Sequence, residues 1–262
     1  MTSAPDITLY VALYGELTPH PWRDPSTAAS DAYSLFVARS SAMGWLRDPP
    51  HDGCGLWGMN DAAYEPTATR VAWFQASLPA HPSPPSGTSP VQPFLACVRD
   101  VVTRLGTLHL EAAQILLPPN PHERTPRPEA RLLQEAGWFT DLSPQAKTTI
   151  RLTLDSGQNP AIPSTAPHLL AWLRDLKQDV LTDLSLTHDD PITLRPTITD
   201  ALWHGPAHQH ITLNATLAEW SLDAIAWLAT LLTYAIQQHN INAPLLLSTA
   251  LNPDSTTPTG NP

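Results

Sequence analysis

Three histidines fall within seven positions of the segment ALWHGPAHQH, residues 201–210. Clustered imidazoles can bind a transition metal or transfer protons near neutral pH. On a strand, His208 and His210 would share one face about 7 Å apart, and the Gly-Pro turn after His204 could fold this residue back toward them. A metal needs three or four converging ligands, and neither an HExxH motif nor closely spaced cysteines accompany the histidines. A metal-dependent enzyme using His204, His208 and His210 is therefore the third of three hypotheses. For His204 and His208 the alternative is a position facing solvent on a hairpin.

His210 and Arg151 are the candidate catalytic residues in the second half of the chain. Residues 148–154 (TTIRLTL) and 208–217 (HQHITLNATL) alternate apolar and polar side chains, as strands with one buried face do. We expect His210 beside Arg151 on the polar face, where the imidazole could act as acid or base and the guanidinium could orient a carboxylate or phosphate. The alternative is a polar pair at a sheet interface. The same face carries three candidate substrate-binding residues: Thr153, Thr212 and Asn214.

The candidate site continues in the first half with aromatic side chains. Strands predicted at 6–14 and 69–78 carry Tyr10, Tyr14 and Phe74 on the face that we expect to lie away from the helices. An exposed aromatic sheet face needs a cover, and the sheet of the second half, or of another subunit, is the simplest one. Two facing sheets would enclose a pocket with one aromatic and one polar wall, a combination common in ligand sites. Alternatively, the sheets pack tightly and the polar row faces solvent.

These strands belong to an order of elements that occurs twice. The tetrapeptide PSTA stands at 25–28 and 163–166, and Leu-Trp stands at 56–57 and 202–203. Around both pairs, hydrophobic periodicity predicts a strand, a helix, two strands, a helix and a strand, which is the ferredoxin-like βαββαβ motif. The expected fold class is α+β, a tandem duplication of this unit whose sheets face each other as an α+β barrel or sandwich. The alternative is an α+β sandwich whose halves resemble each other by accident.

Helices with clear apolar stripes are predicted at 91–105 and at 222–236, and Ser221 is the expected N-cap of the second. Another helix is expected at 167–181, with a proline in its first turn. The predicted domains are a first unit at 1–118, a Pro-rich connector with a short helix at 119–146, a second unit at 147–252 and a disordered tail at 253–262.

The composition argues against several classes of partner. The 262-residue chain has 14 Lys and Arg against 24 Asp and Glu, a net charge of −10, and contains no basic run. A protein that binds phosphate backbones needs a basic surface, so we expect neither nucleic acid nor a membrane as a partner. Cys54 and Cys97 form no disulfide framework. With no signal peptide or membrane span in the sequence, they predict a soluble protein in the reducing cytoplasm.

The leading hypothesis is a protein that binds or converts a small molecule in a pocket between two sheets. The sequence contains no catalytic signature and carries nine tryptophans, which favours a second hypothesis, a non-catalytic accessory protein that binds another protein. A small molecule or a protein is therefore the expected partner, and a homo-oligomer is left open. Neither a cofactor nor a substrate can be named from these residues.

Overall fold

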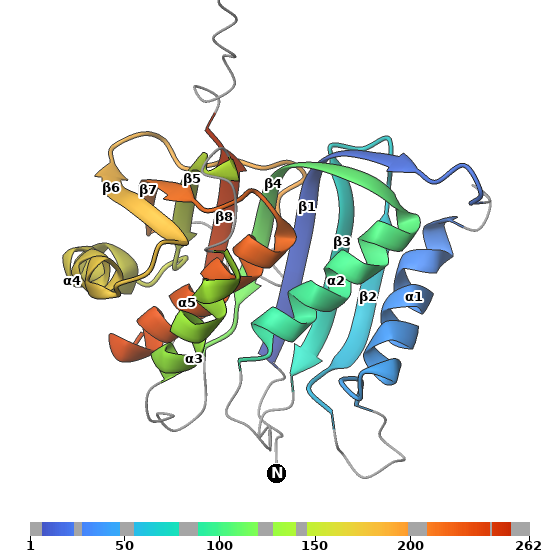
Figure 1. The fold of residues 1–262 in the computed structure, drawn as a ribbon, viewed down its shortest axis with the longest axis horizontal. Helices are drawn as coiled ribbons and strands as arrows, with labels where there is room; N and C mark the ends of the chain where they lie inside the picture. The colour runs from blue at the N-terminus through green and yellow to red at the C-terminus, as the bar shows by residue number, and fades with distance from the viewer. Residues whose placement is uncertain are drawn as a thin grey trace, which may run out of the picture.

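The computed structural model describes five α-helices, one short 3₁₀ helix and eight strands (Figure 1). In chain order they are β1 (Ile7–Pro19), α1 (Ala28–Ala42), β2 (Gly58–Tyr64), β3 (Arg70–Leu78), α2 (Val91–Leu105), β4 (Gly106–Leu117), α3 (Pro128–Ala136), η1 (Gly137–Phe139), β5 (Thr148–Asp155), α4 (Ala161–Asp175), β6 (Leu181–Thr187), β7 (His210–Leu217), α5 (Leu222–Gln238) and β8 (Leu245–Leu251). The described residues are 7–23, 28–47, 55–78, 89–119, 128–139, 146–198, 209–241 and 243–252.

The eight described strands form one antiparallel sheet in the order β2-β3-β1-β4-β8-β5-β7-β6. The α+β class is therefore confirmed, but the expectation of two facing sheets is wrong. The halves of the chain meet edge to edge, because β4 pairs with β8 from Ala112 opposite Ala250 to Leu117 opposite Leu245. Each of these strands would otherwise be an edge with unpaired N–H and C=O groups, and their pairing satisfies both.

The two halves of the sheet have corresponding strand orders. In each half the first and third strands are neighbours and the fourth lies beside the first, giving β2-β3-β1-β4 and β6-β7-β5-β8. In the sequence, α3 and η1 lie between the two halves, within the segment predicted as the connector. The predicted domain boundaries stay a prediction, and the predicted tail at 253–262 lies outside the described residues.

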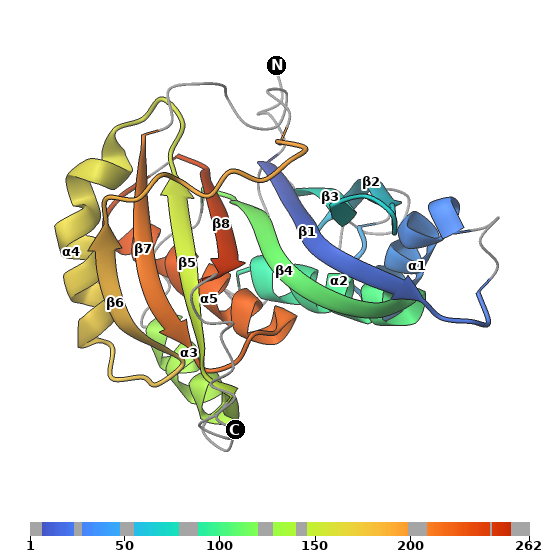
Figure 2. The ribbon, with the colours of Figure 1, turned by 90° about the horizontal axis from the view of Figure 1, so that it is seen from above.

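The helices lie on one side of the sheet (Figures 1 and 2), and α3 packs on α5. The stripes predicted for α2 and α5 are confirmed, and the Oγ of Ser221 accepts a hydrogen bond from the N–H of Ala224 at the start of α5. α4 begins at Ala161, six residues before the predicted start, so Pro167 lies inside the helix and not in its first turn. None of the described helices is long and apolar enough to cross a membrane.

The main core lies between the sheet and the helices. Leu9, Val11 and Leu13 of β1 point into it, and so do Ile150, Leu152 and Leu154 of β5. β1 then bends at Gly15, where φ is +138° and a Cβ would lie 2.1 Å from the carbonyl oxygen of His109. Only glycine fits this bulge. By alternation, the side chains between the core positions point to the opposite face, which we call the open face.

Candidate functional site

Seven of the eight predicted site residues lie together on the open face. On the polar strands, Arg151 is opposite Asn214 and Thr153 is opposite Thr212. His210 is opposite Asp155, so the expectation that it lies beside Arg151 is wrong. β5 and β7 are not consecutive strands, and no hairpin turn fixes their register in the sequence. The roles predicted for His210 and Arg151 stay predictions.

The open face is organised in three rows that run across paired strands from β7 to β3. Every row is mainly polar at the β5 and β7 end and becomes apolar or aromatic toward β1. The rows are His210–Asp155–Leu246–Leu116–Tyr10–Gln75, Thr212–Thr153–Ser248–Gln114–Ala12–Trp73 and Asn214–Arg151–Ala250–Ala112–Tyr14–Arg70. The predicted aromatic and polar walls are therefore two halves of one surface, side by side, and do not face each other.

Phe74 is the predicted site residue that does not belong to this face. It is opposite Val11, is fully buried in the main core, and its ring centroid lies 5.4 Å from that of Phe36 of α1. Trp73, the residue before Phe74, occupies the position on the open face that we predicted for Phe74. The sequence carried a signal for this assignment, because the polar Gln75 and Ser77 of β3 are in phase with Trp73 and not with Phe74.

The aromatic half of the open face is built around Tyr10 and Trp73, whose ring centroids are 6.2 Å apart. Arg70 holds both residues: its Nη1 donates a hydrogen bond of 3.4 Å to the Tyr10 hydroxyl, and its guanidinium carbon lies 5.6 Å from the centre of the Trp73 ring. Burial raises the pKa of the Tyr10 hydroxyl, although the Arg70 charge opposes this. Burial also raises the pKa of Tyr14. Both phenols are therefore neutral hydrogen-bonding groups around neutral pH.

The polar half contains a buried row of hydrogen-bonding side chains. Gln114 Nε2 donates to Ser248 Oγ over 3.1 Å, and the hydroxyls of Thr153 and Thr212 are 3.4 Å apart. All four side chains belong to residues that are at most 5% exposed. Gln114 and Ser248 were not among the predicted site residues, although Gln114 is the one polar residue in the apolar run 112–117.

Three buried atoms in this half lack a partner. Gln114 Oε1, Asn214 Oδ1 and Arg151 Nε have no hydrogen bond to any described residue. The first two are acceptors and the third is a donor. Buried polar atoms are nearly always paired in folded proteins, so these atoms mark a place where the described residues do not satisfy their own polar groups.

Residues 188–198, which we call the strap, cross the open face after β6 (Figure 2). The strap is held through its backbone by side chains from the site. These bonds are Arg151 Nη2 to Asp190 O at 2.6 Å, Ile192 N to Thr153 Oγ1 at 3.0 Å and Tyr14 Oη to Pro196 O at 3.0 Å. Leu194 and Ile198 pack with Tyr10 and Tyr14 in a second apolar cluster. The cover predicted to be a facing sheet is therefore the strap.

The hypothesis of a metal site rests on residues that are only partly described. His204 and His208 lie outside the described residues, and so does Cys54. Among the residues that the structure does describe, no group of three or more His, Cys, Asp or Glu side chains could hold a metal ion. His210 is the member of the predicted trio that can be placed, at the polar end of the open face.

Neither a family model, nor a curated protein, nor a solved structure matches this chain. The function therefore has to be argued from the chemistry of the open face.

Proposed function

We propose that this protein binds a small molecule on the open face of its sheet, beside the strap, where the polar and aromatic halves meet. The observation that supports this most strongly is the set of unpaired buried atoms at Gln114, Asn214 and Arg151. Leaving a buried donor or acceptor without a partner costs about 1–3 kcal/mol. An apolar residue at such a position would avoid this cost, so stability alone does not account for the polar row.

The unpaired atoms also indicate the chemistry of the ligand. Gln114 and Asn214 lie three strands apart, about 14 Å. A molecule would therefore need separate N–H or O–H groups for Gln114 Oε1 and Asn214 Oδ1, and an acceptor for Arg151 Nε. Trp73, which is partly exposed and stacks on the buried Tyr10, offers a surface for an apolar part of the ligand. We therefore infer a small polar molecule with both donor and acceptor groups and one apolar portion.

Conversion of the bound molecule would use His210, with Arg151 orienting the substrate. His210 is opposite Asp155 at the polar end of the first row, and a carboxylate beside an imidazole can fix its orientation for acid–base chemistry. We propose binding as the primary function and keep these residues as the catalytic candidates.

We also infer that the fold arose by tandem duplication of a ferredoxin-like unit. This is supported by the matching element orders β1-α1-β2-β3-α2-β4 and β5-α4-β6-β7-α5-β8, and by the equivalent strand orders of the two half-sheets. After duplication, divergence of the open face would have left one half aromatic and made the other polar.

Our proposal keeps the partners and location expected from the sequence. A net charge of −10 supports a small molecule or a protein as the partner in place of nucleic acid, and we propose a cytoplasmic location with the homo-oligomeric state left open.

A thermal-shift screen of small polar molecules tests the proposed function. The wild-type chain is compared with Gln114→Met, which removes the unpaired oxygen, and with Gln75→Met, which makes the same change on the aromatic half. We expect compounds that raise the wild-type melting temperature to act equally on Gln75→Met and to lose their effect on Gln114→Met. A screen without hits, or hits that are unaffected by Gln114→Met, would count against the open face as the binding site.

A further inference from the structure

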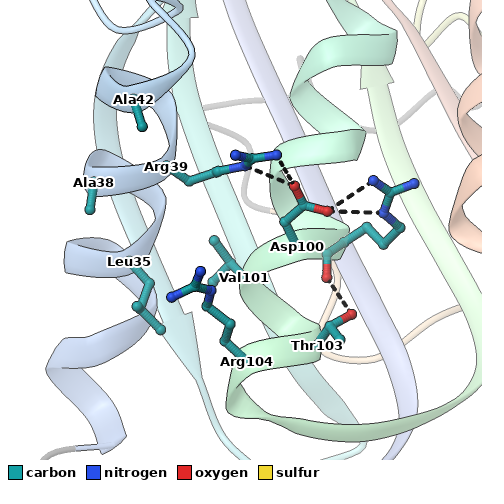
Figure 3. A pocket seen from close by; sticks show the side chains of 9 residues that line it. Leu35, Ala38, Arg39, Ala42, Asp100, Val101, Thr103 and Arg104 are labelled. Atoms are coloured by element: carbon teal, nitrogen blue, oxygen red, sulfur yellow. Dashed lines mark hydrogen bonds and ion pairs between the residues drawn. The ribbon is translucent and has the colours of Figure 1, made fainter.

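A groove lies on the helix layer of the first half, on the opposite side of the sheet from the open face. It runs between α1 and α2 and has a volume of about 560 Å³ (Figure 3). The lining residues of α1 form one stripe with the spacing i, i+3, i+4, i+7, and those of α2 come from its last two turns. The lining residues are Leu35, Ala38, Arg39 and Ala42 of α1 and Arg99, Asp100, Val101, Thr103 and Arg104 of α2.

The groove is positively charged in an acidic chain. Three arginines and one carboxylate line it, and Asp223 of α5 also pairs with Arg99, which leaves one net positive charge (3 − 2) in a chain whose net charge is −10. Arg39 Nη2 lies 2.6 Å from Asp100 Oδ2, and Arg99 Nη2 lies 2.9 Å from Asp100 Oδ1. Figure 3 shows the guanidinium of Arg104 in the groove with no bond to the other residues drawn.

Asp100 fixes the positions of its two arginine partners. Burial alone would raise the pKa of its carboxyl, but hydrogen bonds from Arg99 and Arg39 outweigh this and hold the pKa below its ordinary value. The side chains of both arginines remain 40% exposed. Donors on Arg39 and Arg99 that are not used by Asp100, or by Asp223 of α5, which also pairs with Arg99, can therefore reach an incoming anion.

The floor of the groove is apolar and low. Ala38 and Ala42 are exposed and have small side chains, and the partly exposed Leu35 adds apolar surface. From residue 35 to residue 42 the stripe runs about 10 Å along α1, roughly two helical turns.

We propose that this groove docks an acidic segment of a partner protein, with apolar side chains on the alanine floor and carboxylates paired with Arg39 and Arg104. Charge complementarity is the argument for this occupant, because the three arginines are concentrated there while the chain as a whole repels acidic partners. An open groove two turns long with apolar surface suits a short amphipathic segment. This site is separate from the proposed ligand site on the open face, and either can fail without the other.

The test is selection of random 16-residue peptides displayed on phage against the full chain. The selected peptides are then measured by fluorescence polarisation on four proteins: wild type, Arg104→Glu, Ala38→Trp and Lys177→Glu. Arg104→Glu reverses the charge of an exposed residue of the groove, and Ala38→Trp fills the floor without a change of charge. Lys177→Glu makes the same charge change at an exposed position in the second half. Melting temperatures confirm that each variant is folded.

We expect the selected peptides to be rich in Glu and Asp with apolar residues at helical spacing. Their Kd should rise about tenfold or more, equivalent to about 1.4 kcal/mol, in Arg104→Glu and in Ala38→Trp, and should stay unchanged in Lys177→Glu. Absence of enriched peptides, enrichment of peptides that are not acidic, or unchanged binding to both groove variants would overturn the proposal. So would a groove occupied by a second copy of the chain, detected as a dimer that Arg104→Glu converts to a monomer.

Discussion

The two halves of the open face are built on equivalent strands but have opposite chemistry. On β1, Tyr14 is buried in an apolar cluster with Ala112 and Ile198, and its hydroxyl is paired with the strap. On β5, Arg151 and Thr153 also hold the strap, yet atoms of Arg151 and of its neighbour Asn214 stay unpaired. The tyrosine hydroxyls of the aromatic half are thus paired within the chain, and Arg70 Nε is the unpaired atom there, whereas the polar half contains three such atoms among the described residues.

This difference separates residues that stabilise the fold from residues that are available for binding. Burial of an aromatic ring stabilises the folded state, whereas a buried polar atom without a partner destabilises it. If the comparison is correct, substitutions in the aromatic half should cost stability. Removal of the unpaired polar atoms should cost binding and leave stability unchanged or higher.

Tyr14→Ala should give the largest loss of stability. It removes a ring that is 2% exposed, together with its bond to Pro196, so we expect the free energy of unfolding to fall by about 4 kcal/mol. Tyr14→Phe keeps the ring and removes only the bond to the strap, at a cost of about 1 kcal/mol. Urea denaturation measures both. Equal losses in the two variants would show that the ring does not carry the stability of the aromatic half.

Thr153→Val should cost less than Tyr14→Ala but more than a surface change. The valine keeps the shape of the side chain but removes the oxygen that accepts the N–H of Ile192, so an N–H of the strap loses its partner at a cost of about 2 kcal/mol. Thr212→Val is the matched control, because the Thr212 hydroxyl contacts Thr153 and not the strap. Amide hydrogen exchange of Ile192 should speed up in Thr153→Val alone. Equal exchange in both variants would contradict the proposed role of Thr153.

The aromatic half should also weaken the fold at alkaline pH. Burial raises the pKa values of Tyr10 and Tyr14, so as pH rises the unfolded chain loses these protons first, from about pH 10. The folded state then binds more protons than the unfolded state, and stability falls with rising pH. The double variant Tyr10→Phe/Tyr14→Phe should flatten part of this fall in urea midpoints. Tyr33→Phe, at an exposed position of α1, should not.

The sequence predicted the elements better than their assembly. The 3.6-residue stripe of α2 and the serine cap of α5 are local signals, and both are confirmed. The pairing of β4 with β8 is not a local signal, because either strand could have remained an edge or faced another sheet. The facing-sheet pocket failed for that reason.

The candidate site was predicted only in part, again because local patterns do not fix how strands pair. Strand alternation correctly gathers Tyr10 and Tyr14 on one face and Thr153 and Thr212 on another stretch of the same face. Alternation does not fix register, so His210 was paired with the wrong neighbour. The strap has no periodicity of its own and is placed by three long-range hydrogen bonds, which no sequence pattern announces.

The most direct measurement compares stability and binding in one variant, Gln114→Met/Asn214→Leu. The two substitutions remove the unpaired oxygens, and with them the hydrogen bond from Gln114 Nε2 to Ser248 Oγ, and they keep the approximate side-chain volumes. Urea unfolding and the ligand-induced thermal shift are measured on the same sample. We expect the free energy of unfolding to stay within about 1 kcal/mol of wild type or to rise, while compounds that stabilise the wild type lose their effect. A variant that is about 2 kcal/mol or more less stable, yet responds to the same compounds, would mean that the polar half supports the fold and does not form a binding site.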